Sequence, residues 1–189
     1  MRSGSGLRFD MQKIGDSIIV SASDLVGHLN CLHLTGLDMA VANGTLEMPE
    51  VWDPLLQLLW ERGARHEQAF VDHLKSQGFS VTIIDGIGID DEAIARTRAA
   101  MAAGEEVIVQ GAFRLNRWVG RTDILRRVET PSDLGAWSYE VIDTKLARET
   151  KGGTVLQLCL YSDLVASVQG TRPTFGYVVA PWSDFVPQA

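Results

Sequence analysis

Apolar residues along the chain recur first with helical spacing and then with strand spacing, and these blocks predict an ordered series of elements. Residues 52–78 carry apolar side chains every three or four positions, with Asp53 as a cap, Pro54 in the first turn and Gly78 as a stop, which predicts a long helix. The later blocks predict a strand at 79–85, a helix at 91–104, strands at 105–113, 117–128 and 138–147, a helix at 154–169 and a strand at 174–182. This order is typical of an α/β domain with a central mixed sheet.

The N-terminal part of the chain predicts a helical extension to this domain. Residues 21–44 open with Ser and Asp residues suited to capping a helix, and leucines follow at helical spacing, so a short helix is expected to begin near Ser23. There are no internal repeats and no low-complexity linker. We therefore divide the chain into an N-terminal segment, 1–20, and one domain, 21–189.

Composition indicates a globular protein of the cytoplasm. The chain has 189 residues, of which 46% are apolar and 22% charged. No apolar run approaches the roughly 20 residues that span a bilayer, and the N-terminus has no apolar signal segment, so no membrane association is expected. Cys31 and Cys159 are the two cysteines, too few for a disulfide framework or a four-thiolate metal site.

The distribution of charge is more informative than its total. The net charge of -7 argues against a protein that coats nucleic acid by bulk attraction. Residues 106–151 contain seven acidic and eight basic side chains, so this segment carries +1 and the rest of the chain -8. Two interpretations stay open for this arginine-rich segment, a solvated hairpin and a phosphate-binding surface.

Two acids and a lysine are predicted to converge within that segment. Asp143 and Lys145 are two positions apart in a predicted strand, so they project from the same face, while Thr144 points the other way. Asp123 lies in the preceding strand, and its carboxyl group is expected beside that of Asp143, close enough to share one cation. Carboxylates attract hard cations such as Mg²⁺, which support phosphodiester hydrolysis. An ordinary surface ion pair is the alternative.

Three more side chains are candidates for the same site. His66 falls on the apolar face of the helix at 52–78 and is predicted to point inward, either as a core histidine or as a metal ligand. Gln157 and Tyr161 are four apart and share a helix face, which is either a polar helix surface or part of a site.

Together these residues resemble a known family. The motifs that carry the resemblance are His66 in GARHE, Asp123 in GRTDIL, Asp143 to Lys145 in YEVIDTK, and Gln157 with Tyr161 in QLCLY. In this order they resemble the RecB-like branch of the PD-(D/E)XK nuclease superfamily, over about residues 20 to 180. The opening SASDLVGHLNCLHLTGLDMA is similar to a bacterial RecB-family subgroup whose nuclease domain is often fused to a helicase or a ribonuclease-H-like domain.

The resemblance implies a fold and an activity. The fold is the restriction-endonuclease-like αβββαβ core, here with a helical N-terminal extension. The activity is metal-dependent hydrolysis of DNA phosphodiester bonds in DNA processing or repair, with Mg²⁺ or Mn²⁺ as the cofactor. DNA is the expected partner, together with a helicase or ribonuclease-H-like domain in the same chain or in another.

The resemblance also implies a role for each motif residue. Asp123, Asp143 and Lys145 are the expected catalytic residues. The two aspartates bind the metal with the Thr144 carbonyl, and His66 adds a ligand. Gln157 and Tyr161 form the QxxxY motif, which is expected to contact DNA and organise the site, and the basic residues Arg121, Arg148 and Lys151 are also predicted to bind DNA.

One feature of the family is not expected in this chain. Several RecB-like nucleases hold an iron-sulfur cluster with four cysteines, and Cys31 lies where the first would be. No cysteine follows Tyr161, and Cys159 is predicted to be a small buried residue of its helix. The last residues, 182–189, form no evident terminal element, so we expect the chain to be the N-terminal part of a longer protein.

Other functions remain open at the level of sequence. One is a RecB-like nuclease of the CRISPR-associated type, which trims captured DNA. Another is a catalytically silent DNA-binding module of the same fold, and a third is an acid-rich protein that binds another protein. Retention of His66, Asp123, Asp143 and Lys145 favours the nuclease.

Overall fold

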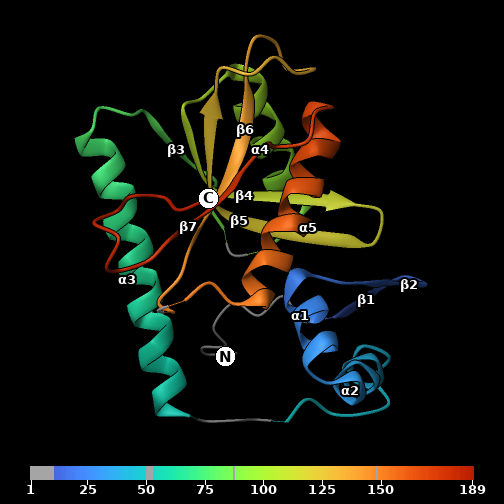
Figure 1. Cartoon of the computed structure of the whole chain (residues 1–189). Coiled ribbons are helices and arrows are strands. Elements are labelled where there is room, and N and C mark those ends of the chain that lie inside the picture. The colour runs from blue at the N-terminus through green and yellow to red at the C-terminus, as the bar shows by residue number, and fades with distance from the viewer. Residues whose placement is uncertain (1–10, 50–52, 87, 148) are drawn as a thin grey trace.

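The centre of the computed structural model, which describes residues 11–49, 53–86, 88–147 and 149–189, is a five-stranded mixed sheet (Figure 1). The strands stand in the order β3 (Val81–Ile83), β4 (Val107–Leu115), β5 (Trp118–Val128), β6 (Ser138–Thr144) and β7 (Gly176–Val179). The three central strands are antiparallel, and the outer strands β3 and β7 run parallel to their neighbours. The predicted α/β class with a mixed sheet is confirmed.

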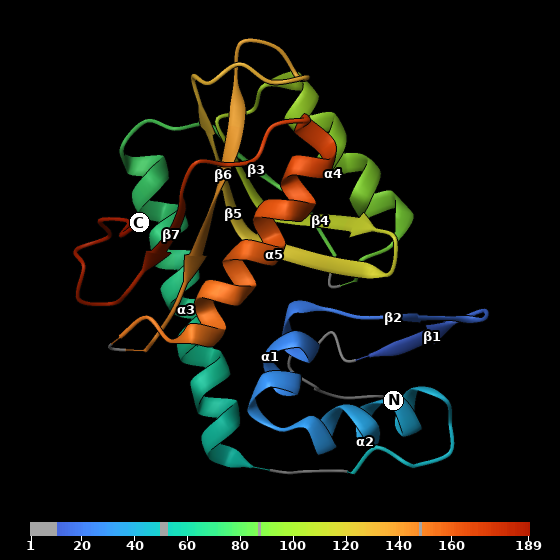
Figure 2. The ribbon, with the colours of Figure 1, turned by 45° about the vertical axis from the view of Figure 1, so that its right-hand side comes forward.

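Helices cover both faces of this sheet (Figure 2). The three are α3 (Pro54–Ser76), α4 (Asp91–Ala103) and α5 (Gly152–Gln169). Because side chains alternate along a strand, Val141 packs under α4 and α5, whereas the next residue, Ile142, packs under α3. The central strands therefore have apolar residues on both faces, and they are buried along most of their length.

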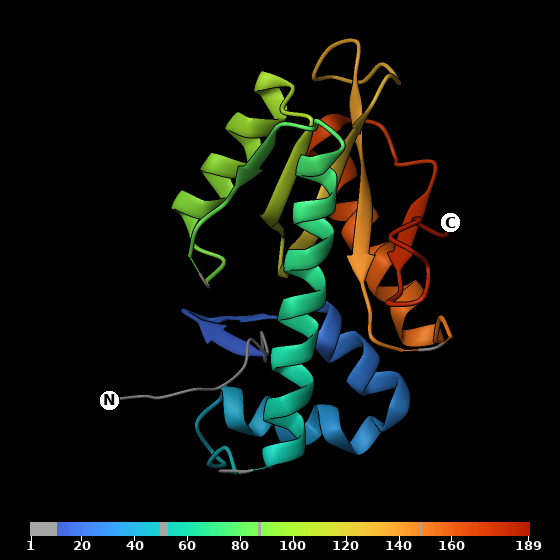
Figure 3. The ribbon, with the colours of Figure 1, turned by 90° about the vertical axis from the view of Figure 1, so that its left-hand side faces the viewer.

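The helix α3 begins as its sequence predicts. Asp53 caps it, since its side chain accepts a hydrogen bond from the Leu55 backbone N–H, and Pro54 occupies the first helical position. The apolar face of this helix is buried in its C-terminal half and exposed in its N-terminal half. Leu55 is 62% exposed, whereas Phe70 is 1% exposed. A helix of 23 residues is about 35 Å long, so its first half extends beyond the sheet (Figure 3).

The N-terminal extension contains a hairpin as well as helices. Strands β1 (Gln12–Ile14) and β2 (Ser17–Ile19) precede α1 (Ala22–Asn30) and α2 (Leu32–Ala42), whereas the sequence pattern predicts a helix alone. The helix α1 starts at Ala22, one residue before the expected Ser23, because Ser21 is its N-cap and forms a capping box with Asp24. It packs against α5. Within the described residues, no helix is long and apolar enough to cross a membrane.

Candidate functional site

The sheet forks at the two aspartates that the sequence singles out. Strands β5 and β6 pair from Val128 and Ser138 as far as Ile124 and Ile142. Beyond that point β5 stays paired with β4 and β6 with β7, and the two strand pairs separate (Figures 1 and 2). Asp123 and Asp143 are the next residues on each side of the fork. The structure therefore places them on adjacent strands, at the same level of the register, as predicted.

Asp143 is the most buried member of the site. Its side chain is fully buried, Oδ1 accepts a hydrogen bond from Gln157 Nε2 at 3.1 Å, and Oδ2 lies 2.7 Å from Lys145 Nζ. Burial and then the nearby Asp123 carboxylate raise the pKa of Asp143 to about 7, and the Lys145 ammonium opposes this rise. The predicted proximity of Asp143 and Lys145 is confirmed, and the alternative of a surface ion pair is wrong because the carboxylate is inaccessible to solvent.

Asp123 is held by the opposite branch of the fork. Its Oδ2 accepts hydrogen bonds from the backbone N–H and the hydroxyl of Thr144, both at 2.8 Å. The Thr144 N–H thus donates a hydrogen bond to a side chain at the point where β5 and β6 no longer pair through their backbones. The role of the Thr144 carbonyl as a metal ligand stays a prediction.

Glu67 is a third carboxylate at the fork, and the sequence pattern did not reveal it. Its Oε1 accepts a hydrogen bond from Gln110 Nε2 at 2.5 Å, and Gln110 in turn accepts one from Arg121 Nε at 3.0 Å. Burial, and then repulsion from Asp123, raise the pKa of Glu67 to about 7. Its position directly after His66 was the available signal. Because Glu67 is one residue out of phase with the apolar helix face, the periodicity of that face does not point to it.

The backbone of Gln110, which donates this hydrogen bond through its side chain, has an unusual conformation. Its φ is 58°, a left-handed value in the middle of β4. Val109 pairs with Ile124 and Gly111 with Thr122, so Gln110 lies at the level of Asp123 in the register. Such values persist where surrounding contacts hold them, often at functional sites. Here the turned backbone accompanies the hydrogen bond to Glu67.

His66 points inward, but toward β7. Its Nε2 lies 3.0 Å from the Val179 carbonyl oxygen, and because that oxygen can only accept, Nε2 carries the proton. The ring stacks on Phe185 with the centroids 6.1 Å apart. Adjacent helix residues point about 100° apart, and Glu67 is the α3 side chain whose pKa the Asp123 carboxylate raises. A metal-binding role for His66 stays a prediction.

Gln157 and Tyr161 face the fork from α5. Gln157 Nε2 also lies 3.2 Å from the Tyr161 hydroxyl, so one amide joins the tyrosine to Asp143. Tyr161 is 7% exposed and packs on Gly120, where a Cβ atom would come within 2.8 Å of its ring. Gln157 therefore holds Asp143, and Tyr161 in turn contacts Gln157. The role of the pair in organising a catalytic site stays a prediction. Its contact with DNA stays a prediction.

The three basic residues predicted to bind DNA have different outcomes. Arg121 is 5% exposed, and its guanidinium donates to the Gln110 side chain and to the carbonyls of Gly88 and Ile84. The surface position that the prediction assumed is wrong, because these internal acceptors hold the side chain inside the protein. Lys151 is exposed at the start of α5. Arg148 lies outside the described residues.

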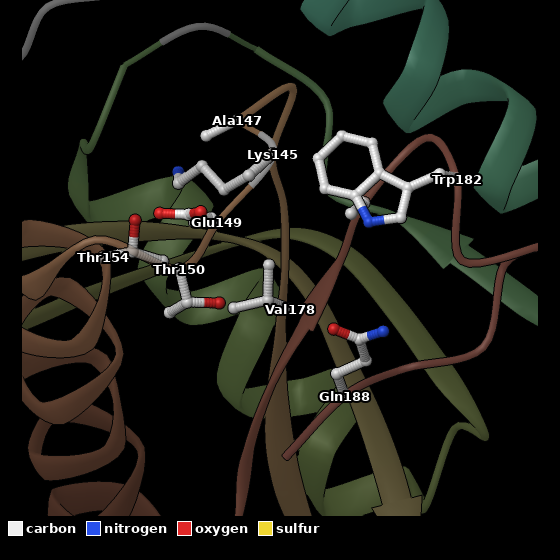
Figure 4. Close-up of a pocket in the computed structure, with 9 residues that line it drawn as sticks. Lys145, Ala147, Glu149, Thr150, Thr154, Val178, Trp182 and Gln188 are labelled. Carbon is white, nitrogen blue, oxygen red and sulfur yellow. The ribbon is translucent and has the colours of Figure 1, made fainter.

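Lys145 can be reached from a small hollow beside the fork. The hollow has a volume of about 100 Å³, and Figure 4 shows the Lys145 side chain on one side of it and Trp182 on the other. Glu149, Thr150 and Thr154 also line it. The Lys145 side chain is 29% exposed, whereas its partner Asp143 is 0% exposed. The ammonium therefore bridges the buried carboxylate and the surface.

Both cysteines are free and exposed. Cys31 lies between α1 and α2, where it ends the first helix and caps the second. The prediction that Cys159 is buried is wrong. In α5 the buried positions include Leu158 and Tyr161, and Cys159 falls on the solvent side of that helix.

The fork brings together three carboxylates and one ammonium, of which two carboxylates have raised pKa values. Each carboxylate turns an oxygen to a protein donor, namely Thr144, Lys145 or Gln110. In this arrangement, no three His, Cys, Asp or Glu side chains of the described residues form a ready cluster for a metal ion. The donors are of the type that hard cations bind, and acquiring a cation would require these oxygens to reorient.

No protein-family model matches the sequence, and no curated protein matches it.

Proposed function

We propose that this protein is a metal-dependent DNA nuclease of the RecB-like type, with a restriction-endonuclease-like core. The observation that carries the proposal is the placing of Asp123, Asp143 and Lys145 at one fork of the sheet. The element order also supports it, since α3, β4, β5, β6, α5 and β7 follow the αβββαβ pattern, with β3 and α4 inserted after the first helix. A place in DNA repair or beside a helicase rests on the resemblance alone.

The site suits a divalent cation in its charge and donor chemistry. Like charges about 4 Å apart repel by roughly 4 kcal/mol at an effective dielectric constant near 20, so clustered carboxylates favour a cation or a proton. Burial, and then repulsion from Asp123, raise the pKa values of Asp143 and Glu67, so a cation would also stabilise their charged forms. Asp123 and Asp143 would hold Mg²⁺ or Mn²⁺, with Glu67 as a further candidate. A bound cation neutralises phosphate charge and makes a water molecule more acidic.

The chain's own residues then have distinct tasks. Gln157 holds Asp143 through Oδ1, and Thr144 holds Asp123 through Oδ2, so both carboxylates keep fixed orientations. Lys145 is the cation nearest the buried carboxylate, and it is placed to orient the attacking water or to stabilise charge on the phosphate. The hollow beside Lys145 gives water a way in.

Cleavage of labelled single- and double-stranded DNA tests the proposal. We expect the purified chain to cleave DNA in Mg²⁺ or Mn²⁺ and not in chelator. Asp143→Asn and Lys145→Ala should each lower the rate by at least about 100-fold, because each removes a group that acts on the reacting phosphate. Asp16→Asn, a change at an exposed residue of the β1–β2 turn, is the matched control and should cleave as the wild type does.

Measuring DNA binding without metal separates the effect of each substitution on catalysis from its effect on the charge that the DNA meets. In chelator at pH 8, above the Asp143 pKa of about 7, Asp143→Asn should bind DNA as tightly as the wild type or more tightly, because a negative charge is removed. Lys145→Ala should bind less tightly, and most clearly at low salt. Undiminished cleavage by Asp143→Asn would end the nuclease proposal, whereas identical binding by all variants would refute the electrostatic account alone.

A further inference from the structure

A second hollow lies on the α3 side of the fork, and the proposed chemistry does not use it. It has a volume of about 470 Å³, within the range of small-molecule sites. It lies between α3 and the segments that follow β6 and β7. Its lining is Leu59, Arg62, Arg65, His66, Leu146 and Pro181.

Two of these residues are cations without an acidic partner among the described residues. Arg62 forms no hydrogen bond or ion pair with that part of the chain, and the Arg65 contact is one from Nε to the Glu61 carbonyl oxygen at 3.3 Å. Both are exposed and lie one helical turn apart, so they share a face. In a chain with a net charge of -7, two adjacent guanidinium groups of this kind indicate a surface that receives an anion from outside.

The other side chains that line this second hollow include apolar ones, and the hollow adjoins the fork. Leu59, Leu146 and Pro181 contribute it, and Leu59 is 42% exposed. Leu146 directly follows Lys145, which lines the smaller hollow, so the chain after β6 separates the two hollows. The two hollows therefore adjoin along this segment, and a strand whose phosphate lies at Lys145 is expected to continue toward Arg62 and Arg65.

We propose that this hollow is a subsite for one unpaired nucleotide next to the scissile phosphate. Arg62 and Arg65 bind its phosphate group, and Leu59, Leu146 and Pro181 contact its base or sugar. The nucleotide is unpaired because a base stacked inside a duplex cannot turn its faces to apolar side chains. The inference rests on the proposed nuclease function and adds to it the kind of strand that the site accepts.

The double variant Arg62→Gln/Arg65→Gln tests the subsite. Arg98→Gln is the matched control, because Arg98 is exposed on α4, across the sheet from α3, and forms no hydrogen bond or ion pair with a described residue. The probe is a fluorescently labelled single-stranded oligonucleotide titrated in chelator at several salt concentrations. A blunt duplex of the same sequence is titrated alongside. Thermal melts establish that all variants are folded.

We expect the double variant to bind the single strand about 5- to 20-fold more weakly than the wild type, with a salt slope lower by about 0.7 for each phosphate that the protein no longer neutralises. Arg98→Gln should bind as the wild type does. In Mn²⁺, KM for the single strand should rise by a similar factor while kcat changes by less than about twofold, because the subsite binds the strand and does not act on the reacting atoms.

Each contrary result has a distinct meaning. Equal binding by the double variant and Arg98→Gln, with an active wild type, overturns the subsite and leaves the nuclease proposal standing. An equal loss of affinity for the blunt duplex overturns the unpaired nucleotide. A fall in kcat at unchanged KM overturns the binding role, and a wild type that neither binds nor cleaves DNA overturns the nuclease proposal together with the subsite.

Discussion

At the scale of single residues, the site depends on how Asp143 is buried. Strand alternation predicts that Asp143 and Lys145 share a face, and the ion pair at 2.7 Å confirms it. Alternation does not predict how deeply Asp143 is buried. Its burial results from α5, which packs over the strand and places Gln157 beside Asp143. Glu67 was missed because it lies one residue out of phase with the apolar face of α3, and it meets Gln110, distant in the sequence, only in the folded chain.

The raised pKa of Asp143 predicts how the metal-free protein responds to pH. The pKa rises from 3.8 to about 7 on folding, so between these values the folded state binds the proton more tightly than the unfolded state. The stability that this group contributes is present at low pH and is lost as the pH rises through about 7. In chelator, Asp143→Asn should therefore gain about 1 to 3 kcal/mol in unfolding free energy over the wild type between pH 5 and 8.

Urea unfolding in chelator at several pH values measures this difference. Comparing the two proteins removes contributions common to both, such as the lowered pKa of Glu106, which has the opposite sign. Asp16→Asn is again the control and should keep a constant offset from the wild type. A difference between Asp143→Asn and wild type that does not change with pH would show that Asp143 is not protonated in the folded, metal-free protein.

At the scale of elements, helix starts were easier to predict than contacts between elements. The cap at Asp53 and the bounds of α4 follow from local sequence. The exposed half of α3, the hairpin β1–β2 and the fork do not, because each is set by where a partner element ends. The fork also needs close approach between β5 and α5, which Gly120 permits.

Substituting Gly120 tests this approach. A Cβ atom there would lie 2.6 Å from Leu164 Cδ1 and 2.8 Å from Tyr161 Cε1, so Gly120→Ala should cost about 1 to 3 kcal/mol and displace the helix that carries Gln157. Gly36→Ala in α2 is the control, since its Cβ atom would meet nothing within 4 Å, and it should be neutral or slightly stabilising. Urea unfolding measures both, and an equal effect of the two substitutions would contradict the packing described.

At the scale of the whole molecule, the predicted order of elements agrees with the observed fold, and the predicted acidic residues lie together in it. The sequence predicts a mixed sheet with Asp123 and Asp143 on successive strands, and those two strands separate where these residues lie. Net charge alone argued against a protein that coats nucleic acid by bulk attraction. The basic groups are nevertheless distributed unevenly, and Arg62, Arg65 and Lys145 line hollows on the two sides of the chain after β6. This distribution could not be predicted, because α3 and β6 are far apart in the sequence.

The most direct test of the proposed metal centre is to count the Mn²⁺ ions that the protein binds without DNA, by electron paramagnetic resonance of free Mn²⁺ during a titration at pH 8. The fork carboxylates predict saturable binding of about one ion or more per chain in the wild type and in Asp16→Asn. Asp143→Asn should weaken this binding at least about tenfold, because it removes a charged ligand. Mn²⁺ binding that is equal in all three proteins, or absent from the wild type, would contradict the claim that the fork is a metal centre.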